Sequence, residues 1–447
     1  MYTLPEQSIP HYTGYDVIVA GGGPAGCAAA ASAARDGAKT LLIESTFVLG
    51  GMGTAGLVPA WCPFSDKEKI LYRGIAEEVF TAAKAEMPIV GRDDLDWVPI
   101  DAEGLKRVYD RLVTDSGVRV LFGTQVVGAD CAKGKIRALI AANKDGLAAY
   151  TAGVYIDCTG DGDLAAAAGA QFHMGAEDGT LMPSTHCFTL AGVNMEAFFN
   201  DPKNGQRTTG GLHPNNKNSI AYAFAKDERY PDITDEHLCN SYLGADVVGF
   251  NAGHLWQVDN TDPFSVSAAM ILGRKIAKEY KDALADYFPE AFGNTYLCAT
   301  AQLMGVRESR RIVGDYTLTA EDYQSRASFP DEISRNCYYI DVHMTPEEKA
   351  ACPDRSAVQA RYGKGESHGV PYRCLTPKGI VNLAVAGRII SCDRRLLASL
   401  RVMPNCLTTG EAAGTAAAMA ARGNCDMHAV DIAALRARLR EKGAYFK

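Results

Sequence analysis

The stretch YDVIVAGGGPAGCAAAASAARDGAKTLLIE, residues 15–44, decides the fold of this chain. A short apolar run leads into a glycine cluster, which opens an alanine-rich segment, and a second apolar run ends on Glu44. Gly21, Gly23 and Gly26 have the G-x-G-x-x-G spacing of a dinucleotide-binding βαβ unit. We expect Gly21 to make the tight turn, Gly23 to admit a pyrophosphate, and Gly26 to let the helix pack closely on the strand.

Two further features support this interpretation. The helix after the glycines would offer free N–H groups and the positive end of its dipole to the phosphates. Glu44 ends the second strand, where its carboxylate can accept hydrogen bonds from both ribose hydroxyls. Because strand, glycines, helix, second strand and acid fall in register, an ordinary glycine turn is the weaker interpretation.

Length and composition bound the function. The chain has 447 residues, of which 47% are hydrophobic and 22% charged, so two or three lobes with large cores are expected. The net charge is −8 and no long basic run occurs, which disfavours nucleic acid and acidic membrane surfaces as partners. No apolar run reaches about 18 residues and no signal peptide is recognisable, so we expect a cytoplasmic protein without a membrane span.

The thirteen cysteines include no C-x-x-C pair. Their odd number and irregular spacing argue against a disulfide framework, a zinc site and an iron–sulfur cluster. We therefore expect reduced thiols and no metal ion.

The order of segments predicts a folded lobe that is interrupted by an insertion. Strand–helix alternation extends to about residue 182, gives way to polar and aromatic loops over residues 183–367, and returns in residues 368–447. One helix, residues 266–284, is expected inside the insertion. A chain that leaves a fold and returns to it forms a second domain, and ligand clefts are common between two such domains.

Three more segments carry a recognisable pattern. They are CTGDGD (residues 158–163), GVRESRRIVGDY (305–316) and PYRCLTPKGIVNLAVAGR (371–388). By itself the first is either a capped turn or a nucleotide contact. Together with the glycine loop, these segments resemble the FAD-dependent oxidoreductases of the glutathione-reductase structural superfamily, and a bacterial family within it in particular. The resemblance implies an α/β fold, in which a Rossmann-like FAD-binding domain of the glutathione-reductase type (1–182 and 368–447) carries an inserted α+β substrate domain (183–367).

The resemblance also implies where FAD lies. The glycine loop would hold the pyrophosphate, Glu44 the adenosine ribose, and residues 49–56 would lie along the flavin. A helix starting near residues 407–410 would point its N-terminus at the flavin N1/C2=O end, where the reduced flavin carries negative charge. The implied FAD contacts are Gly21, Gly23, Pro24, Ala25, Gly26, Glu44, Ser45, Gly50, Gly51, Met52, Gly53, Thr54, Val126, Thr159, Gly160, Asp161, Gly387, Arg388, Arg401, Gly410 and Ala413.

Some positions depart from the pattern of the superfamily. Ser45 stands where a basic residue is common, and Arg388 stands where many members have an acid. Residues 49–56 contain no histidine, which disfavours covalent attachment of the flavin there.

The candidates for catalysis are polar residues that the insertion and its return would bring to the flavin. Arg307 belongs to a dense charged set that either clamps an anionic group or forms salt bridges at a helix start. His343 shares one side of a strand with Asp341 and either moves a proton or is a structural histidine. Arg401 could stabilise the reduced flavin or bind an anion. The predicted catalytic residues are His343, Arg307, Arg373, Tyr372 and His254.

The favoured function is hydride transfer between flavin N5 and a small polar organic substrate. The alternative is a thiol–disulfide enzyme or an electron-transfer subunit, which the missing cysteine motifs and the missing second G-x-G-x-x-G disfavour. A flavin scaffold or sensor and a flavin monooxygenase rank lower. The expected partners are the substrate and an external electron donor or acceptor, and the oligomeric state is left open.

Overall fold

The main sheet of the protein has a parallel core. The computed structural model describes residues 6–200, 212, 218–345, 347–348 and 361–447. The strand order is β3-β2-β1-β6-β5-β4, with β15 beside β6. Strands β3, β2, β1, β6 and β15 pair in parallel, whereas β4, β5 and β6 form an antiparallel meander. The strands are β1 (His11–Ala20), β2 (Thr40–Ile43), β3 (Arg119–Leu121), β4 (Gln125–Ala132), β5 (Lys135–Asn143), β6 (Gly146–Asp157) and β15 (Leu383–Val385).

The predicted βαβ unit is confirmed. Helix α1 (Pro24–Arg35) follows the glycines directly, with Pro24 in its first turn, where a missing N–H costs nothing. The apolar runs on either side, residues 17–20 and 40–43, are buried on both faces, as a central parallel pair requires. The prediction of an α/β fold with a Rossmann-like parallel core is therefore confirmed, while its assignment to the glutathione-reductase type stays a prediction.

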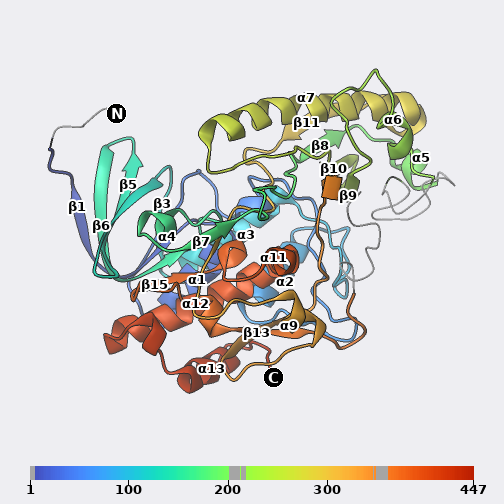
Figure 1. Ribbon diagram of the computed structural model, residues 1–447. Helices are drawn as coiled ribbons and strands as arrows, with labels where there is room; N and C mark the ends of the chain where they lie inside the picture. The colour runs from blue at the N-terminus through green and yellow to red at the C-terminus, as the bar shows by residue number, and fades with distance from the viewer. Residues whose placement is uncertain (1–5, 201–211, 213–217, 346, 349–360) are drawn as a thin grey trace.

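Small residues let α1 touch the long helix α12 (Met403–Gly423). A Cβ atom added to Gly410 would lie 2.1 Å from the carbonyl oxygen of Ala25, and one added to Gly414 would lie 2.1 Å from that of Ala29. Only glycine fits such backbone contact, because a side chain would overlap the carbonyl. Both helices pack on the main sheet (Figure 1). Helix α12, which belongs to the C-terminal part of the chain, therefore lies beside the helix that follows the glycine loop.

Further helices and short sheets complete this part of the molecule. Asp101 caps the N-terminus of helix α3, because its side chain accepts hydrogen bonds from two backbone N–H groups of the first turn. The helices are α2 (Ile75–Ala85), α3 (Ala102–Asp115), α4 (Asp163–Ala167), α9 (Ala320–Gln324), α11 (Arg394–Leu400) and α13 (Ile432–Glu441). The short strands are β7 (Phe172–Met174) with β12 (Arg310–Ile312) and β13 (Glu332–Asn336) with β14 (His368–Pro371). The 3-10 turns are η1 (Gly51–Gly53), η2 (Tyr372–Cys374), η3 (Gly387–Ile389) and η4 (Met427–Ala429).

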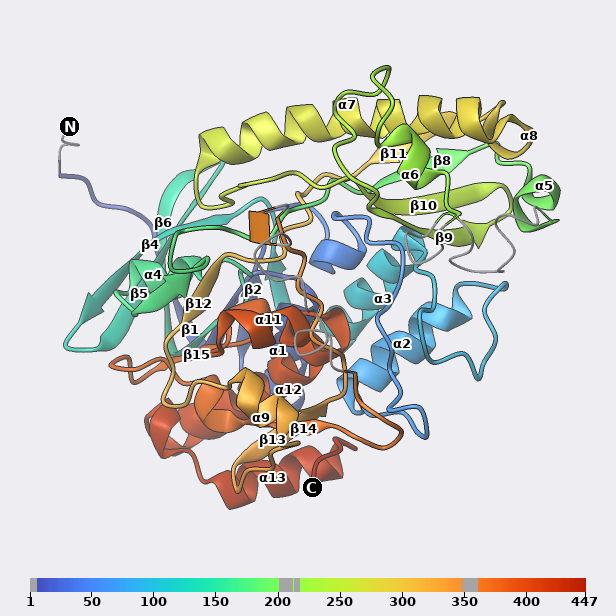
Figure 2. The ribbon, with the colours of Figure 1, turned by 45° about the vertical axis from the view of Figure 1, so that its right-hand side comes forward.

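The described residues between 188 and 306, called here the second region, build a separate hydrophobic core. Helix α7 (Pro263–Tyr287) contains the predicted helix 266–284 and lies along an antiparallel sheet of order β11-β8-β10-β9 (Figures 1 and 2). Beyond residue 306, the buried hydrophobic side chains belong to the main core again. The sequence instead predicts an insertion that extends to residue 367. The domain bounds stay predictions. The other elements are β8 (Phe188–Ala191), β9 (Leu238–Gly244), β10 (Val247–Ala252), β11 (Tyr296–Thr300), α5 (Met195–Asn200), α6 (Ala221–Phe224) and α8 (Pro289–Phe292).

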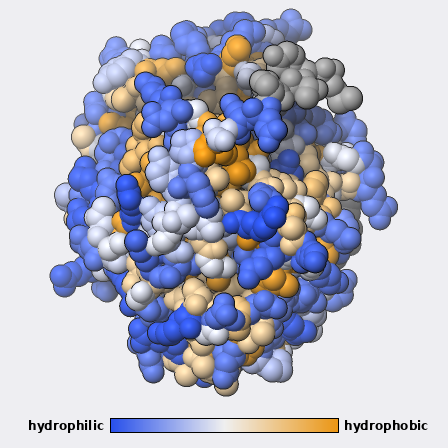
Figure 3. Space-filling view, turned by 90° about the vertical axis from the view of Figure 1, so that its left-hand side faces the viewer, coloured by the Kyte–Doolittle hydropathy of each residue, from blue (hydrophilic) through white to orange (hydrophobic). Residues whose placement is uncertain are grey.

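The surface carries mostly polar side chains on the face that Figure 3 shows, with apolar ones scattered between them. Among the helices that the structure describes, none is long and apolar enough to cross a membrane.

A buried carboxyl group makes the stability of α12 depend on pH. Glu411 is 2% exposed and accepts a 3.0 Å hydrogen bond from the backbone N–H of Ile75 at the start of α2. Burial raises the pKa of Glu411 from 4.5 to about 7. A raised carboxyl pKa means that folding favours the protonated form, so this group's contribution to stability is greatest below pH 4.5 and falls as the pH rises through 7.

We therefore expect Glu411→Gln to gain stability relative to the wild type as the pH increases. The difference in unfolding free energy between the two proteins should shift by about 3 kcal/mol between pH 4.5 and pH 8, in favour of the variant. Denaturant unfolding at both pH values measures this shift. Glu103→Gln, at an exposed position of α3, is the control and should shift little. An equal shift in both variants would contradict the burial argument.

Candidate active site

A cavity of about 1640 Å³ extends from the glycine loop to the second region. Its size exceeds the roughly 300–1,000 Å³ of ordinary ligand pockets, which leaves room for an extended dinucleotide and a substrate together. One part is lined by the ends of β1, β2 and β6, where ligands of doubly wound sheets bind. The other part is lined by residues 237–241, 303–307 and 338–343.

The glycine loop fits a nucleotide. A Cβ atom added to Gly23, at the start of α1, would have no described atom within 4 Å other than those of Gly23 and its chain neighbours. A pyrophosphate therefore has space against the helix N-terminus. Glu44 is fixed at the cavity wall because its Oε2 accepts a 2.6 Å bond from the N–H of Gly22 and its Oε1 a 2.7 Å bond from that of Thr46. The donor set is thus suited to phosphate and ribose.

Most of the predicted FAD contacts line this cavity. The lining includes Gly21, Gly23, Pro24, Ala25, Glu44, Ser45, Gly51, Met52, Val126, Thr159, Gly160, Asp161, Gly387, Arg388 and Arg401. Gly26, Gly50, Gly53, Thr54, Gly410 and Ala413 are absent from the lining, and their contacts with FAD stay predictions. These residues pack inside the protein: the Thr54 hydroxyl, for example, donates to the carbonyl of Leu49, and Gly410 faces the backbone of Ala25.

The start of α12 also differs from the prediction. The helix begins at Met403, about one turn before the expected start at residues 407–410. Val402, Met403 and Cys406 therefore line the cavity, and the N-terminus of α12 opens onto it. That this N-terminus meets the flavin stays a prediction.

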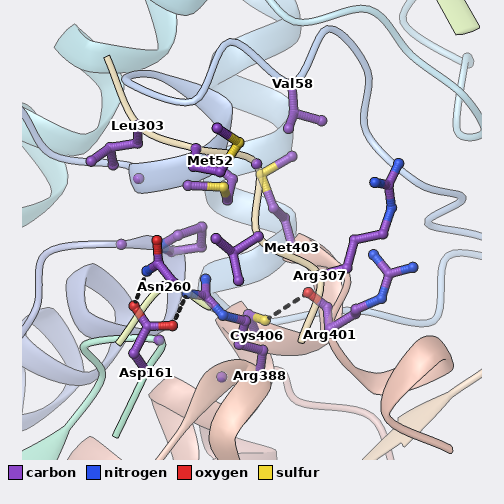
Figure 4. A pocket seen from close by; sticks show the side chains of 18 of the residues that line it. Met52, Val58, Asp161, Asn260, Leu303, Arg307, Arg388, Arg401, Met403 and Cys406 are labelled. Atoms are coloured by element: carbon purple, nitrogen blue, oxygen red, sulfur yellow. Dashed lines mark hydrogen bonds and ion pairs between the residues drawn. The ribbon is translucent and has the colours of Figure 1, made fainter. Parts of the chain in front are cut away.

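A link between the two parts of the protein closes one side of the cavity. Asp161, in the CTGDGD turn, accepts a 2.8 Å bond from Arg388 and a 2.5 Å bond from the side-chain amide of Asn260 (Figure 4). Asn260 lies in the loop before α7, so this carboxylate ties the second region to the nucleotide-binding part. The same turn is held by Asp157, whose side chain accepts bonds from the backbone of Thr159 and Ala165.

Two guanidinium groups lie near each other at another wall (Figure 4). Arg307 Nη1 donates to the carbonyl of Pro183 at 2.8 Å and to the hydroxyl of Thr185 at 2.7 Å. Burial, followed by the charge of Arg401, lowers the pKa of Arg307 to about 10, and the group remains a cation at neutral pH. Arg401 donates to the carbonyl of Asp341 at 3.1 Å, while its Nε is buried and meets no hydrogen-bond partner among the described residues.

Two of the predicted histidines, His343 and His254, lie together between the carboxylates of Asp341 and Asp235. His343 Nε2 lies 3.4 Å from Asp341 Oδ2, and His343 Nδ1 lies 2.8 Å from His254 Nε2. The opposite nitrogen of His254, Nδ1, contacts the carboxylate of Asp235. Burial, followed by the charge of Arg307, lowers the pKa of His343 to about 3, so this imidazole is neutral at physiological pH. The structure thus brings the predicted His343 and His254 together.

His237 completes this cluster and was not predicted from the sequence. Its ring stacks on that of His254 with centroids 4.1 Å apart and meets the ring of His343 edge-on at 5.2 Å. One ligand atom of each histidine lies within 4.8 Å of the others, a grouping that could hold a metal ion. The sequence offered one signal. His237 and Cys239 are two residues apart where β9 begins, so their side chains face the same side of the strand.

Two predicted catalytic residues lie elsewhere. The Tyr372 hydroxyl donates to the carbonyl of Met427 at 2.8 Å, and Arg373 Nε donates to Asp331 at 2.9 Å. Neither side chain lines the cavity. The structure therefore places Tyr372 and Arg373 away from the cavity, with protein partners of their own, and gives no support to the prediction that they contact the substrate.

The charged set around Arg307 divides into two roles. Glu308 is 1% exposed and pairs with Arg311 at 2.5 Å and with Arg394 at 3.1 Å. Such a buried network is structural, since removing one partner would leave an uncompensated charge inside the protein. Arg310 pairs with Asp163 at 3.1 Å. The structural interpretation holds for Glu308 and Arg311, and Arg307 is the member that joins the arginine pair at the cavity wall.

The site and the fold are those of a nucleotide-binding α/β protein. The sequence model of the family described as FAD dependent oxidoreductase matches residues 16–439. The chain therefore belongs to the FAD-dependent oxidoreductase family, and it is an oxidoreductase whose cofactor is FAD.

Individual relatives are distant. A glutathione reductase of Yarrowia lipolytica (strain CLIB 122 / E 150) is 34% identical over 127 residues, which are 26% of this chain and 25% of that protein, so the match spans about a quarter of either. A geranylgeranyl bacteriochlorophyll reductase-like protein from Thermoplasma acidophilum aligns with a TM-score of 0.44 at 13% identity, over 96% of this chain and 83% of that one. The p-nitrophenol 4-monooxygenase PnpA from Pseudomonas putida DLL-E4 aligns with a TM-score of 0.43 at 11% identity, over 97% and 82%.

Proposed function

We propose that this enzyme transfers a hydride between flavin N5 and a small polar organic substrate that carries an anionic or strongly hydrogen-bonding group. The observation that carries the proposal is the arginine pair, Arg307 and Arg401, in the same cavity as the nucleotide-binding loop. FAD supplies the hydride acceptor or donor, and the protein supplies binding, orientation and electrostatics.

The balance of charge at this wall favours an anionic substrate group. The two guanidinium groups face one neighbouring carboxylate, that of Asp341, which lies 3.8 Å from Arg401. Among the described residues, Arg307 Nη2 makes one long contact of 3.5 Å, to the side-chain oxygen of Asn251, so it retains donor capacity. Guanidinium groups bind carboxylates through parallel charge-assisted hydrogen bonds, which are stronger in a buried site than in water.

The cysteines of the cavity argue against thiol–disulfide chemistry. Cys62 and Cys406 both line the cavity and are free thiols. Burial raises the pKa of each of these two thiols to about 12, so they stay protonated at neutral pH. Because the thiolate is the nucleophile in disulfide exchange, neither cysteine is activated for that reaction.

Anaerobic mixing of the oxidised enzyme with pools of compounds tests the proposal. We expect a pool of hydroxy acids to bleach the flavin absorbance, or a pool of enoates to reoxidise the dithionite-reduced enzyme, and neutral sugars to do neither. An external electron acceptor or donor would then complete the cycle. Bleaching by neutral sugars alone would contradict the anionic substrate, and coupling of the flavin to a reducible protein disulfide would support the thiol–disulfide alternative instead.

A further inference from the structure

We propose that His237, His254 and His343 bind a divalent transition metal ion, such as Zn²⁺, at the wall of the cavity. The proposal rests on the proposed function only in that an open position of the metal would take an oxygen atom of the substrate. It assigns His343 a ligand role in place of the acid/base role that the sequence predicts.

The three imidazoles reach one point from separate segments. His237 directly precedes β9, and His254 lies two residues after β10. His343 follows Val342, which packs against the main core. Their ligand atoms lie within 4.8 Å of one another, and His237 and His254 are both less than a tenth exposed. Imidazole nitrogen is a preferred ligand of zinc, copper, nickel and iron.

Carboxylates hold the outer nitrogens of two of these rings. Asp235 contacts His254 Nδ1, and Asp341 lies 3.4 Å from His343 Nε2. A histidine that binds a metal usually donates its other ring N–H to a carboxylate, which fixes the tautomer and points the free lone pair at the ion. The ring of His254 shows this arrangement, and an ion-pair contact places Asp341 beside the outer nitrogen of His343. The inner nitrogens, Nε2 of His254 and Nδ1 of His343, face each other.

The charges around the two rings suit a divalent cation. The facing nitrogens, His254 Nε2 and His343 Nδ1, lie 2.8 Å apart, and without an ion one ring donates its N–H to the other. The carboxylates of Asp235 and Asp341 lie beside the outer nitrogens of these rings. A divalent ion in the place of the shared proton would balance both negative charges.

The cavity provides an open coordination position. Zn–N bonds are about 2.0–2.1 Å long and tetrahedral, so the facing nitrogens must move apart by about half an ångström. His237 and His343 both line the cavity, which leaves the fourth position directed into it. Three protein ligands with one open position are typical of catalytic rather than structural zinc.

The metal content of the untagged holoenzyme is the first test. After dialysis against a chelator, titration with ZnCl₂ alone should give about one bound ion per chain by elemental analysis, together with a higher melting temperature. His254→Gln should abolish both effects. The matched control is His428→Gln, whose histidine pairs with Asp315 away from the cluster and whose loss should change neither. FAD content and melting temperature report whether each variant is folded.

Asp235→Asn provides an independent variant if His254→Gln does not fold. Because Asp235 acts through His254, we expect zinc affinity to fall about 10- to 100-fold while FAD content stays the same. Wild-type protein that takes up no more zinc, cobalt or nickel than His254→Gln would overturn the proposal, and the rings would then share a proton. A zinc-binding protein whose flavin no substrate bleaches would support this site and contradict the proposed function, while bleaching of a protein without metal affinity would do the reverse.

Discussion

Gly26→Ala should prevent stable folding, whereas Gly23→Ala, three residues earlier, should leave the fold intact and weaken FAD binding. A Cβ atom at position 26 would lie 1.7 Å from the carbonyl oxygen of Gly21 and 3.2 Å from the side chain of Cys158. The glycine loop and the end of β6 would have to move together to relieve this overlap. We expect a loss of at least about 3 kcal/mol, since overpacking a rigid core costs this much where no flexible side chain can yield.

The Gly23→Ala substitution should affect FAD binding rather than stability. Its backbone has φ −70° and ψ −174°, which alanine adopts without strain, and the added methyl group would enter open space. Stability without the cofactor should change by less than about 1 kcal/mol. The methyl group would occupy the space assigned to the pyrophosphate, so FAD affinity should fall at least about tenfold, which corresponds to 1.4 kcal/mol.

Two measurements separate these effects: denaturant unfolding of the protein freed of FAD, and titration of that protein with FAD. Gly128→Ala on β4, where the new Cβ would make an ordinary 3.7 Å contact with Ile140, is the control for both. A Gly23→Ala protein that binds FAD as tightly as the wild type would show that the pyrophosphate does not approach this residue.

The contrast between these glycines illustrates how far the sequence determines the site. The spacing of Gly21, Gly23 and Gly26 predicts the βαβ unit because a short loop, its strand and its helix leave the backbone few choices. Glu44 is equally local, since it follows the buried strand directly. The same reasoning does not show which glycines serve close packing, as Gly26 does against Gly21 and Gly410 against Ala25.

The convergence of side chains on the second part of the cavity could not be predicted in this way. His237 and His343 are more than a hundred residues apart and meet only because two parts of the fold close on one cavity. The sequence indicated His254 and His343 singly, but no local pattern placed them beside each other or indicated the contact of Asp235 with His254. Conversely, Arg373 belongs to a recognisable motif, yet its guanidinium turns away to Asp331. Long-range convergence and side-chain direction are the physical information that a single sequence lacks.

Arg307→Gln should lower kcat/KM for the physiological substrate a hundredfold or more. If Arg307 holds an anionic group in a buried site, its loss removes charge-assisted hydrogen bonds worth about 3 kcal/mol or more, and each 1.36 kcal/mol is a factor of ten in rate. Glutamine retains polar atoms near Pro183 and Thr185, the present acceptors of Arg307 Nη1, so the fold should persist. FAD content and the melting temperature check this.

Arg373→Gln is the matched control for this prediction, because it removes the same charge from a residue whose partner, Asp331, lies outside the cavity. Anaerobic stopped-flow measurement of flavin reduction should show a large loss of rate or saturation for Arg307→Gln and a change of less than about twofold for Arg373→Gln. Equal effects in the two variants would mean that Arg307 does not hold the substrate. If the Arg307→Gln substitution instead lowered the rate equally with anionic and neutral substrates, the positive charge of Arg307 would act on the flavin. That result would contradict the proposal that Arg307 binds an anionic group of the substrate.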